Sequence, residues 1–150
     1  MEVEFKEQKK QSVLSIRTRT ALADLPNIIG DSYHKIAAYL EELGEQPADV
    51  PFTAYYNMDM QNLDVEMGFP VARPLLGKGD IKAGEIAQGK VAWYMYKGPY
   101  SELEPVYNEI FRQITEKGCQ LKGVCYEYYY NSPGEVPDSE LLTRIVIPII

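Results

Sequence analysis

Hydrophobic residues recur with the period of an α-helix in two segments of the chain. The positions in the first segment are Ile29, Tyr33, Ile36, Leu40 and Leu43. Those in the second segment are Leu103, Tyr107, Ile110 and Ile114. Steps of three and four residues place such side chains along one face of a helix. Gly44 and Gly118 follow the two stripes and are typical of helix C-termini, so the pattern predicts two amphipathic helices that end there.

The starts of the two predicted helices carry different signals. Pro26 is typical of a first helical turn, where its missing amide hydrogen costs no hydrogen bond. Ser101, followed three residues later by Glu104, has the spacing of a capping box. We therefore expect the first helix to begin near Pro26 and the second near Ser101.

Segments rich in β-branched and aromatic residues flank both helices and predict strands. The expected strands are Val3–Glu7, Val13–Thr18, Phe52–Asn57, Leu63–Val71, Val91–Lys97, Val124–Asn131 and Leu141–Ile149. Residues 72–90 are rich in glycine, and we interpret them as the connection between two halves of the chain.

The two halves repeat each other. Each apolar position of the second helix lies 74 residues after its counterpart, as in 103−29 and 107−33, and the two glycines keep the same offset. The motif Tyr55-Tyr56-Asn57 returns 74 residues later as Tyr129-Tyr130-Asn131. Pro70 and Pro148 lie 78 residues apart, so the second hairpin has four extra residues. A fixed period of this kind indicates a duplicated structural unit.

These elements predict an α+β fold in a single domain, residues 1–150. It consists of tandem duplicated β-α-β-β units, about 1–74 and 84–150. We expect the units to form a pseudo-twofold antiparallel sheet with the two helices on its outer face. A central ligand cleft is expected between the halves, because clefts between repeats are common small-molecule sites.

Composition narrows the range of partners. The chain carries 15 Lys and Arg against 22 Asp and Glu, a formal net charge of −7, and therefore lacks the basic face that nucleic-acid binding requires. No apolar run reaches the roughly 18 residues of a membrane span, and the charged start does not resemble a secretory signal. We expect a cytoplasmic protein with no nucleic-acid or membrane partner. The sequence does not determine the oligomeric state, for which a monomer is favoured. One histidine and two separated cysteines predict no metal site, and no cofactor motif is present.

One acidic residue interrupts the apolar and aromatic segment Val124–Asn131. Side chains alternate along a strand, so Glu127 shares a face with Tyr129. If the second helix covers the other face, both point into the cleft, where burial raises the pKa of the carboxyl group and a bound cation offsets the cost. Aromatic faces add about 0.5–2 kcal/mol each to the binding of a cation. The alternative is a solvent-facing glutamate on an open sheet.

Trp93 belongs to the strand Val91–Lys97. Alternation places Val91, Trp93 and Met95 on one face of this strand. The pattern leaves open whether this face packs in the core or lines the cleft.

Repeat symmetry extends the candidate site to the first half. Thr53 and Tyr55 correspond to Glu127 and Tyr129 at the 74-residue offset. We therefore expect Thr53, Tyr55 and Asn57 to face the cleft. The site should be asymmetric, with a hydroxyl group on one wall and a carboxylate on the other.

Four motifs, in order and spacing, carry a resemblance that covers essentially the whole chain. They are DVEMGFPV (Asp64–Val71), VAWYMYKGPY (Val91–Tyr100), EYYYNSP (Glu127–Pro133) and TRIVIP (Thr143–Pro148). Together they resemble the GyrI-like small-molecule-binding domain, also called the AraC-type or bacterial transcription-activator effector-binding domain.

The resemblance implies a site and its ligands. In such domains a glutamate on the penultimate strand meets cationic aromatic drugs, and it corresponds to Glu127. Aromatic residues around it stack on the ligand, which implies contacts from Trp93, Tyr55 and Tyr129. Many members are the sensor half of a transcription regulator. This chain shows no helix-turn-helix region, so we expect a standalone member.

Three functions are compatible with the resemblance. The main prediction is a binder, rather than an enzyme, that senses or sequesters small amphipathic, cationic molecules. The alternative is a hydrolase of strained, cyclopropane-type electrophiles, with Glu127 as general acid and base and a tyrosine hydroxyl assisting. A third is a protein-binding module of the gyrase-modulator type.

Overall fold

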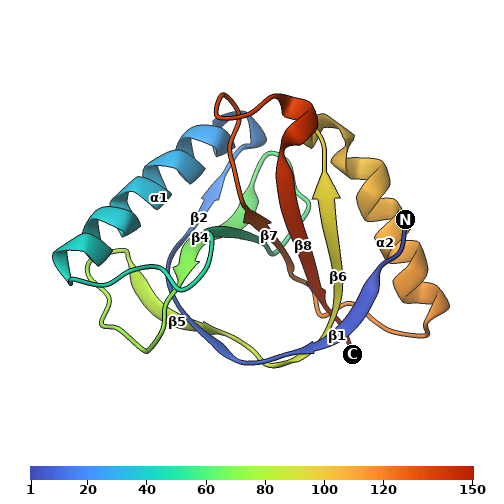
Figure 1. Cartoon of the computed structure of the whole chain (residues 1–150), viewed down its shortest axis with the longest axis horizontal. Helices are drawn as coiled ribbons and strands as arrows, with labels where there is room; N and C mark the ends of the chain where they lie inside the picture. Colours follow the sequence, from blue (N-terminus) through green and yellow to red (C-terminus); the bar gives the residue numbers. More distant parts are fainter. The chain divides into compact units, whose positions relative to one another are not determined.

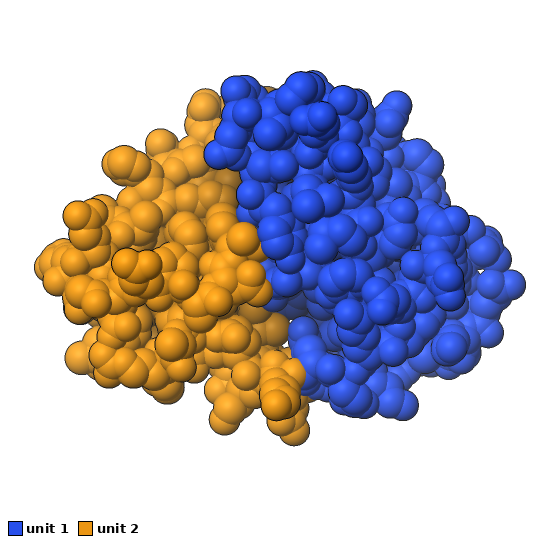
Figure 2. Space-filling model, in the orientation of Figure 1, with its two compact units in different colours: residues 1–8, 89–150 blue, residues 9–88 orange.

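The computed structural model describes residues 1–150, which form two compact units. Unit 1 consists of residues 1–8 and 89–150, and unit 2 consists of residues 9–88 (Figure 2). Each unit contains four antiparallel strands and one α-helix (Figure 1). Neither helix is long and apolar enough to cross a bilayer.

The sheet of unit 2 has the strand order β3-β4-β2-β5. Its strands are β2 (Gln11–Thr20), β3 (Phe52–Tyr55), β4 (Leu63–Pro70) and β5 (Lys82–Ile86). A 3-10 turn, Leu22–Asp24, leads into α1 (Leu25–Glu42), which has Pro26 in its first turn as predicted. The apolar stripe of α1 buries Ile36 and Leu40 against side chains of β2, because burial removes these surfaces from water.

The sheet of unit 1 has the strand order β1-β6-β8-β7. Its strands are β1 (Glu4–Gln8), β6 (Gly89–Lys97), β7 (Cys125–Tyr129) and β8 (Leu142–Pro148). A 3-10 turn, Tyr100–Glu102, leads into α2 (Leu103–Glu116), and another, Asp138–Glu140, lies in the β7–β8 hairpin. The stripe of α2 buries Ile110 and Ile114 against side chains of β6 and β8.

Strand register confirms the duplication. Val13 stands opposite Pro70 in unit 2, and Val91 stands opposite Pro148 in unit 1, so both pairs keep the offset of 78 (91−13 and 148−70). Because α2 has 14 residues and α1 has 18, the offset is 78 at the first residues of the helices (103−25) and 74 at their last residues (116−42). The longer β7–β8 hairpin restores the offset of 78. The predicted α+β class and the tandem β-α-β-β units are therefore correct.

The edge strands differ from the prediction. The segment expected as Val3–Glu7 in the first half is β1, and it pairs with β6 of unit 1. Residues 72–90, expected as a connection only, contain β5, which pairs with β2. Four of the five β5 residues are exposed, so the segment lacks the alternation that predicts a strand. Both pairings are tertiary contacts that a local pattern does not encode.

The predicted helix ends were correct at the C-termini and wrong at one N-terminus. Gly44 and Gly118 have φ angles of 71° and 76°, in the left-handed region that favours glycine. The capping box at Ser101 was wrong. Ser101 lies inside the 3-10 turn, and the N-cap of α2 is Glu102, which makes no side-chain capping bond. The 3-10 turn moves the start of α2 beyond the position from which Ser101 could cap it.

Candidate ligand-binding site

Glu127 lies in the middle of β7 and is 7% exposed. It stands opposite Ile145 of β8, and side chains directly opposite each other in an antiparallel pair share a face. Ile145 packs in the core cluster with Ile110 and Ile114 of α2. Glu127 therefore points to the side that α2 covers. The condition under which Glu127 and Tyr129 would face away from the helix, with α2 on the other face of this strand, is therefore not met.

Two tyrosine hydroxyl groups hold the Glu127 carboxylate. The hydroxyl of Tyr107, from α2, donates to Oε2 at 2.5 Å. The hydroxyl of Tyr129, two residues along β7, donates to Oε1 at 2.8 Å. No lysine, arginine or histidine forms an ion pair with Glu127. The buried acid is therefore satisfied by neutral donors.

Burial raises the pKa of Glu127 above its ordinary value. The hydrogen bonds from Tyr107 and Tyr129 oppose this rise, because they stabilise the ionised carboxylate. Burial is the larger effect, since an ion pays a desolvation cost that neutral donors offset only in part. An external cation beside this carboxylate would lower its pKa and recover part of that cost.

The two tyrosines that contact the carboxylate each pair with a further aromatic ring. Tyr100 and Tyr129 meet edge to face with centroids 6.0 Å apart, and Tyr107 and Phe111 lie 5.8 Å apart. Tyr100 is 37% exposed. Its pKa is raised by burial and by the negative charge of Glu127, which places it within the electrostatic reach of that group. The rings provide apolar and π surface beside a negative charge, as cation recognition requires.

Thr143 is a further polar residue on this side of the sheet. It stands opposite Tyr129 on β8 and is 0% exposed. Its Oγ1 has no hydrogen-bond partner, although buried hydroxyl groups nearly always have one. Sequence reasoning missed Thr143. Comparing the repeats at the offset of 78 would have found it, because the corresponding residue is the apolar Val65 and the hydroxyl is present in one half only.

The contact that Glu127 makes with the helix tyrosine has a counterpart at Thr53 in unit 2. Thr53 is 0% exposed, and its Oγ1 lies 2.8 Å from the hydroxyl of Tyr33 on α1. Tyr33 and Tyr107 lie 74 residues apart, as do Thr53 and Glu127, so the same helix position contacts the same strand position in both units. Tyr55 is half-buried and packs on the cluster that contains Leu25 and Leu63. Sequence reasoning placed Tyr33 and Tyr107 only on helix stripes and missed both contacts.

Asn57 has a structural role that the sequence did not predict. Its Oδ1 accepts from the amide of Asp64 at 2.9 Å, and its Nδ2 donates to the carbonyl of Asn62 at 3.0 Å. Its counterpart Asn131 makes the equivalent bonds to Leu142 and Glu140 at 2.9 and 3.2 Å. These bonds close the β3–β4 and β7–β8 hairpins. Asn57 therefore does not offer its amide to a ligand, contrary to expectation.

Trp93 lies on the other face of the unit 1 sheet. It stands opposite Val146, whereas its neighbour Ala92 packs in the cluster that α2 covers. The Nζ of Lys6 lies 3.8 Å from the centroid of its ring. Glu127 and Trp93 are thus separated by the sheet. The resemblance implied ligand contacts from both residues, and the alternation on β6 left the face of Trp93 open; the register through β8 places the two on opposite faces.

The two cysteines are free, and Cys119 and Cys125 are both half-buried. Burial, helped by the charge of Glu127, raises the pKa of Cys125 to about 11, so its thiol stays protonated at neutral pH. No group of three His, Cys, Asp or Glu side chains converges in an arrangement that would hold a metal ion.

Comparison with known proteins gives one family. The model of the GyrI-like small molecule binding domain matches residues 1–150. No curated protein sequence matches the chain. The crystal structure of the EcmrR C-terminal domain shares 21% identity with a TM-score of 0.76, over 99% of this chain and 97% of that one. In the EcmrR–DNA complex, this chain spans 57% of the EcmrR chain, with 21% identity and a TM-score of 0.84.

Two other solved structures share the fold. A hydrolase from Listeria innocua has 14% identity and a TM-score of 0.71, over 99% of this chain and 92% of that one. SAV2435 bound to tetraphenylphosphonium has 11% identity and a TM-score of 0.70, over 100% of this chain and 94% of that one. At such low identities these likenesses establish the fold alone.

Proposed function

Because this chain belongs to the GyrI-like small molecule binding domain family, we propose that it binds small amphipathic cations of aromatic character at Glu127. The observation that carries the proposal is the buried carboxylate of Glu127, which has two tyrosine hydroxyl groups and no cation as partners. Natural proteins pair buried charges, so a lone buried carboxylate favours a ligand that supplies the missing charge.

Electrostatics give the proposal its scale. A unit charge about 4 Å from the carboxylate gains about 4 kcal/mol at an effective dielectric constant of about 20, before desolvation of the ligand. Rings such as Tyr129 and Tyr100 add roughly 0.5–2 kcal/mol each when they face the cation. A diffuse organic cation loses less hydration than a compact ammonium ion, and this difference favours large aromatic cations.

The ligand replaces contacts that the protein makes with itself. Tyr107 donates to the carboxylate from α2, so a cation in direct contact with Glu127 displaces this hydroxyl and moves the helix side chain. Thr143 offers an unpaired hydroxyl on the same face for a polar group of the ligand. The ligand roles of Thr53 and Tyr55 stay predictions.

A binding experiment tests the proposal directly. Tetraphenylphosphonium, the ligand bound in SAV2435, is titrated into the protein by calorimetry. We expect Glu127→Gln to weaken binding at least about tenfold, a change of about 1.4 kcal/mol. The matched control is Glu66→Gln in unit 2, since Glu66 also accepts from a tyrosine, Tyr56, at 2.6 Å. Equal affinities of the two variants and the wild type would refute the role of Glu127.

The second candidate function is hydrolysis. The short Tyr107–Glu127 contact, 2.5 Å, joins a carboxyl group of raised pKa to a phenol, as general acid–base catalysis uses. Here Glu127 would take a proton from water that attacks a strained, electrophilic ring and return it to the ring carbon that leaves. Mass spectrometry of a cyclopropane-type substrate tests this role. Repeated turnover to a product heavier by one water supports it, and stoichiometric capture or no reaction excludes it.

A further inference from the structure

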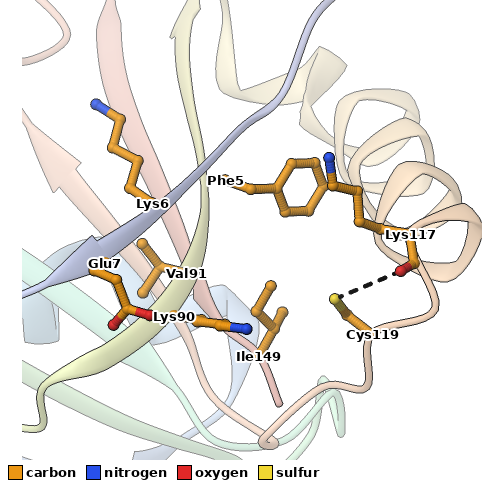
Figure 3. Close-up of a pocket in the computed structure, with 8 residues that line it drawn as sticks. All are labelled: Phe5, Lys6, Glu7, Lys90, Val91, Lys117, Cys119 and Ile149. Atoms are coloured by element: carbon orange, nitrogen blue, oxygen red, sulfur yellow. Dashed lines mark hydrogen bonds between the residues drawn. The ribbon is translucent and has the colours of Figure 1, made fainter.

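A pocket of about 410 Å³ lies in unit 1, and Figure 3 shows the residues that line it. It is bounded by β1, the start of β6, the end of β8 and the turn after α2. The lining residues are Phe5, Lys6, Glu7, Lys90, Val91, Lys117, Cys119 and Ile149. The volume falls within the roughly 300–1,000 Å³ typical of small-molecule sites. None of these residues belongs to the Glu127 site.

The pocket combines an apolar floor with a basic rim. Val91 and Ile149 are 1% and 2% exposed, and Phe5 is half-buried. Three lysines and a single acid, Glu7, line the pocket, in a chain whose net charge is −7. The amine of Lys6 is held over the ring of Trp93 and beside Glu4, so the positive charge of the rim comes from Lys90 and Lys117. Lys90 and Lys117 form no ion pair, and Figure 3 shows the Lys90 amine beside Ile149.

The ring of Phe5 and the amine of Lys117 link the floor to the rim. The Nζ of Lys117 lies 4.8 Å from the centroid of the Phe5 ring. The ammonium group of Lys117 therefore presents its positive charge at the edge of the apolar surface. An anion with an apolar body can therefore contact both at once.

The basic rim belongs to one unit only. Strand register and the repeat offsets give the unit 2 counterparts of Lys6, Lys90 and Lys117, which are Gly84, Ser12 and Leu43. None of them is charged. The acid Glu7 keeps an acidic counterpart, Glu85. The duplicated fold does not require three lysines at this place, so they are a property of the pocket in unit 1.

Backbone hydrogen bonds fix the walls of the pocket. The amide of Ile149 donates to the carbonyl of Lys90 at 3.0 Å, and the amide of Lys122 donates to the carbonyl of Pro148 at 3.2 Å. Gln120 and Ile150 exchange two bonds of 3.3 and 2.8 Å, which join the turn after α2 to the end of the chain. The pocket is thus preformed, and a ligand does not have to order it.

We propose that this pocket binds a small amphipathic anion, a carboxylate or similar oxyanion on a short aliphatic chain. The chain packs on Phe5, Val91 and Ile149, with a gain of about 25 cal/mol for each Å² of apolar surface buried. The anionic head meets Lys90 and Lys117. The acidic surface elsewhere opposes this little, because the Debye length is about 8 Å at physiological ionic strength.

Cys119 gives a local readout, since it lines the pocket whereas Cys125 does not. The raised pKa of Cys125, about 11, makes it the unreactive internal reference. The rate of Cys119 alkylation by iodoacetamide is followed by peptide mass spectrometry with increasing decanoate. We expect decanoate to slow it at least about fivefold at saturation, and decyltrimethylammonium, with the same tail and a positive head, to leave it unchanged. Failure of decanoate to protect Cys119, or equal protection by both, would overturn the proposal.

Charge-reversal variants assign the head group. Lys90→Glu with Lys117→Glu should raise the decanoate concentration for half protection at least about tenfold, with protection compared within each variant. The control, Lys9→Glu with Lys97→Glu, takes the net charge to the same −11 (−7 − 4) and should leave protection intact. If both double variants raise the decanoate concentration for half protection equally, overall charge explains the effect and the proposal is contradicted. Glu127→Gln should not change decanoate protection, so this result stands or falls independently of the Glu127 site.

Discussion

Removing the hydroxyl of Tyr107 isolates the contribution of the buried carboxylate. In Tyr107→Phe the 2.5 Å bond to Glu127 is lost, and hydrogen bonds to charged groups contribute about 1.5–3 kcal/mol to the free energy of unfolding. The matched variant is Tyr33→Phe, because Tyr33 holds the same helix position and contacts neutral Thr53 at 2.8 Å. A neutral bond contributes about 0.5–1.5 kcal/mol. Tyr107→Phe should therefore cost about 1–1.5 kcal/mol more than Tyr33→Phe.

Thermal and urea unfolding of both variants measure the difference. For a chain of this length, 1 kcal/mol shifts Tm by about 2–4 °C, so the expected separation is roughly 2–6 °C. The separation depends on pH, because protonation of Glu127 converts its bond with Tyr107 into a neutral one. Burial raises the pKa of Glu127, so the two variants should converge as pH falls, starting above the range in which an ordinary glutamate titrates. Equal losses of stability in the two variants at alkaline pH, or a Tm difference between them that does not change with pH, would refute a charged, buried Glu127.

Two further predictions concern the same face of the sheet. Thr143→Val should stabilise the protein by about 1 kcal/mol in urea unfolding, because it removes a buried hydroxyl that has no partner; a loss of stability would show that the hydroxyl is satisfied. Glu127→Gln should flatten the pH dependence of stability. A raised folded pKa means that the folded state binds more protons, so the wild type loses stability as pH rises from the ordinary glutamate pKa through the raised one. The same slope in Glu127→Gln would assign it to another group.

Periodicity was sufficient to predict the repeated elements. The two helical stripes and the 74-residue offset depend on spacing alone, and spacing is a local property of the chain. Pro26 and the two C-terminal glycines act through their own backbone preferences, so they also gave correct positions. The pairing of β1 with β6 depends on residues far apart in sequence, and no local pattern contains it.

The orientation of Glu127 could not be predicted, for a related reason. Alternation along β7 defines two faces but does not say which one the helix covers. In the structure α2 covers the face that carries Glu127, because the register places Glu127 opposite Ile145, which packs against α2. That register depends on the conformation of the long β7–β8 hairpin. The same missing information left the face of Trp93 open, and the register of β6 to β8 assigns it.

The central claim, that a cation binds at the buried carboxylate of Glu127, is tested most directly by counting protons. Calorimetric titrations of tetraphenylphosphonium in buffers of different ionisation enthalpy give the number of protons released at each pH. A bound cation lowers the raised pKa of Glu127. At a pH between the pKa values of the free protein and the complex, Glu127 is protonated in the free protein and ionised in the complex. Binding in this interval should therefore release up to one proton per ligand. Glu127→Gln should release none. Binding without proton release across the whole pH series, or equal release by the variant, would contradict the account.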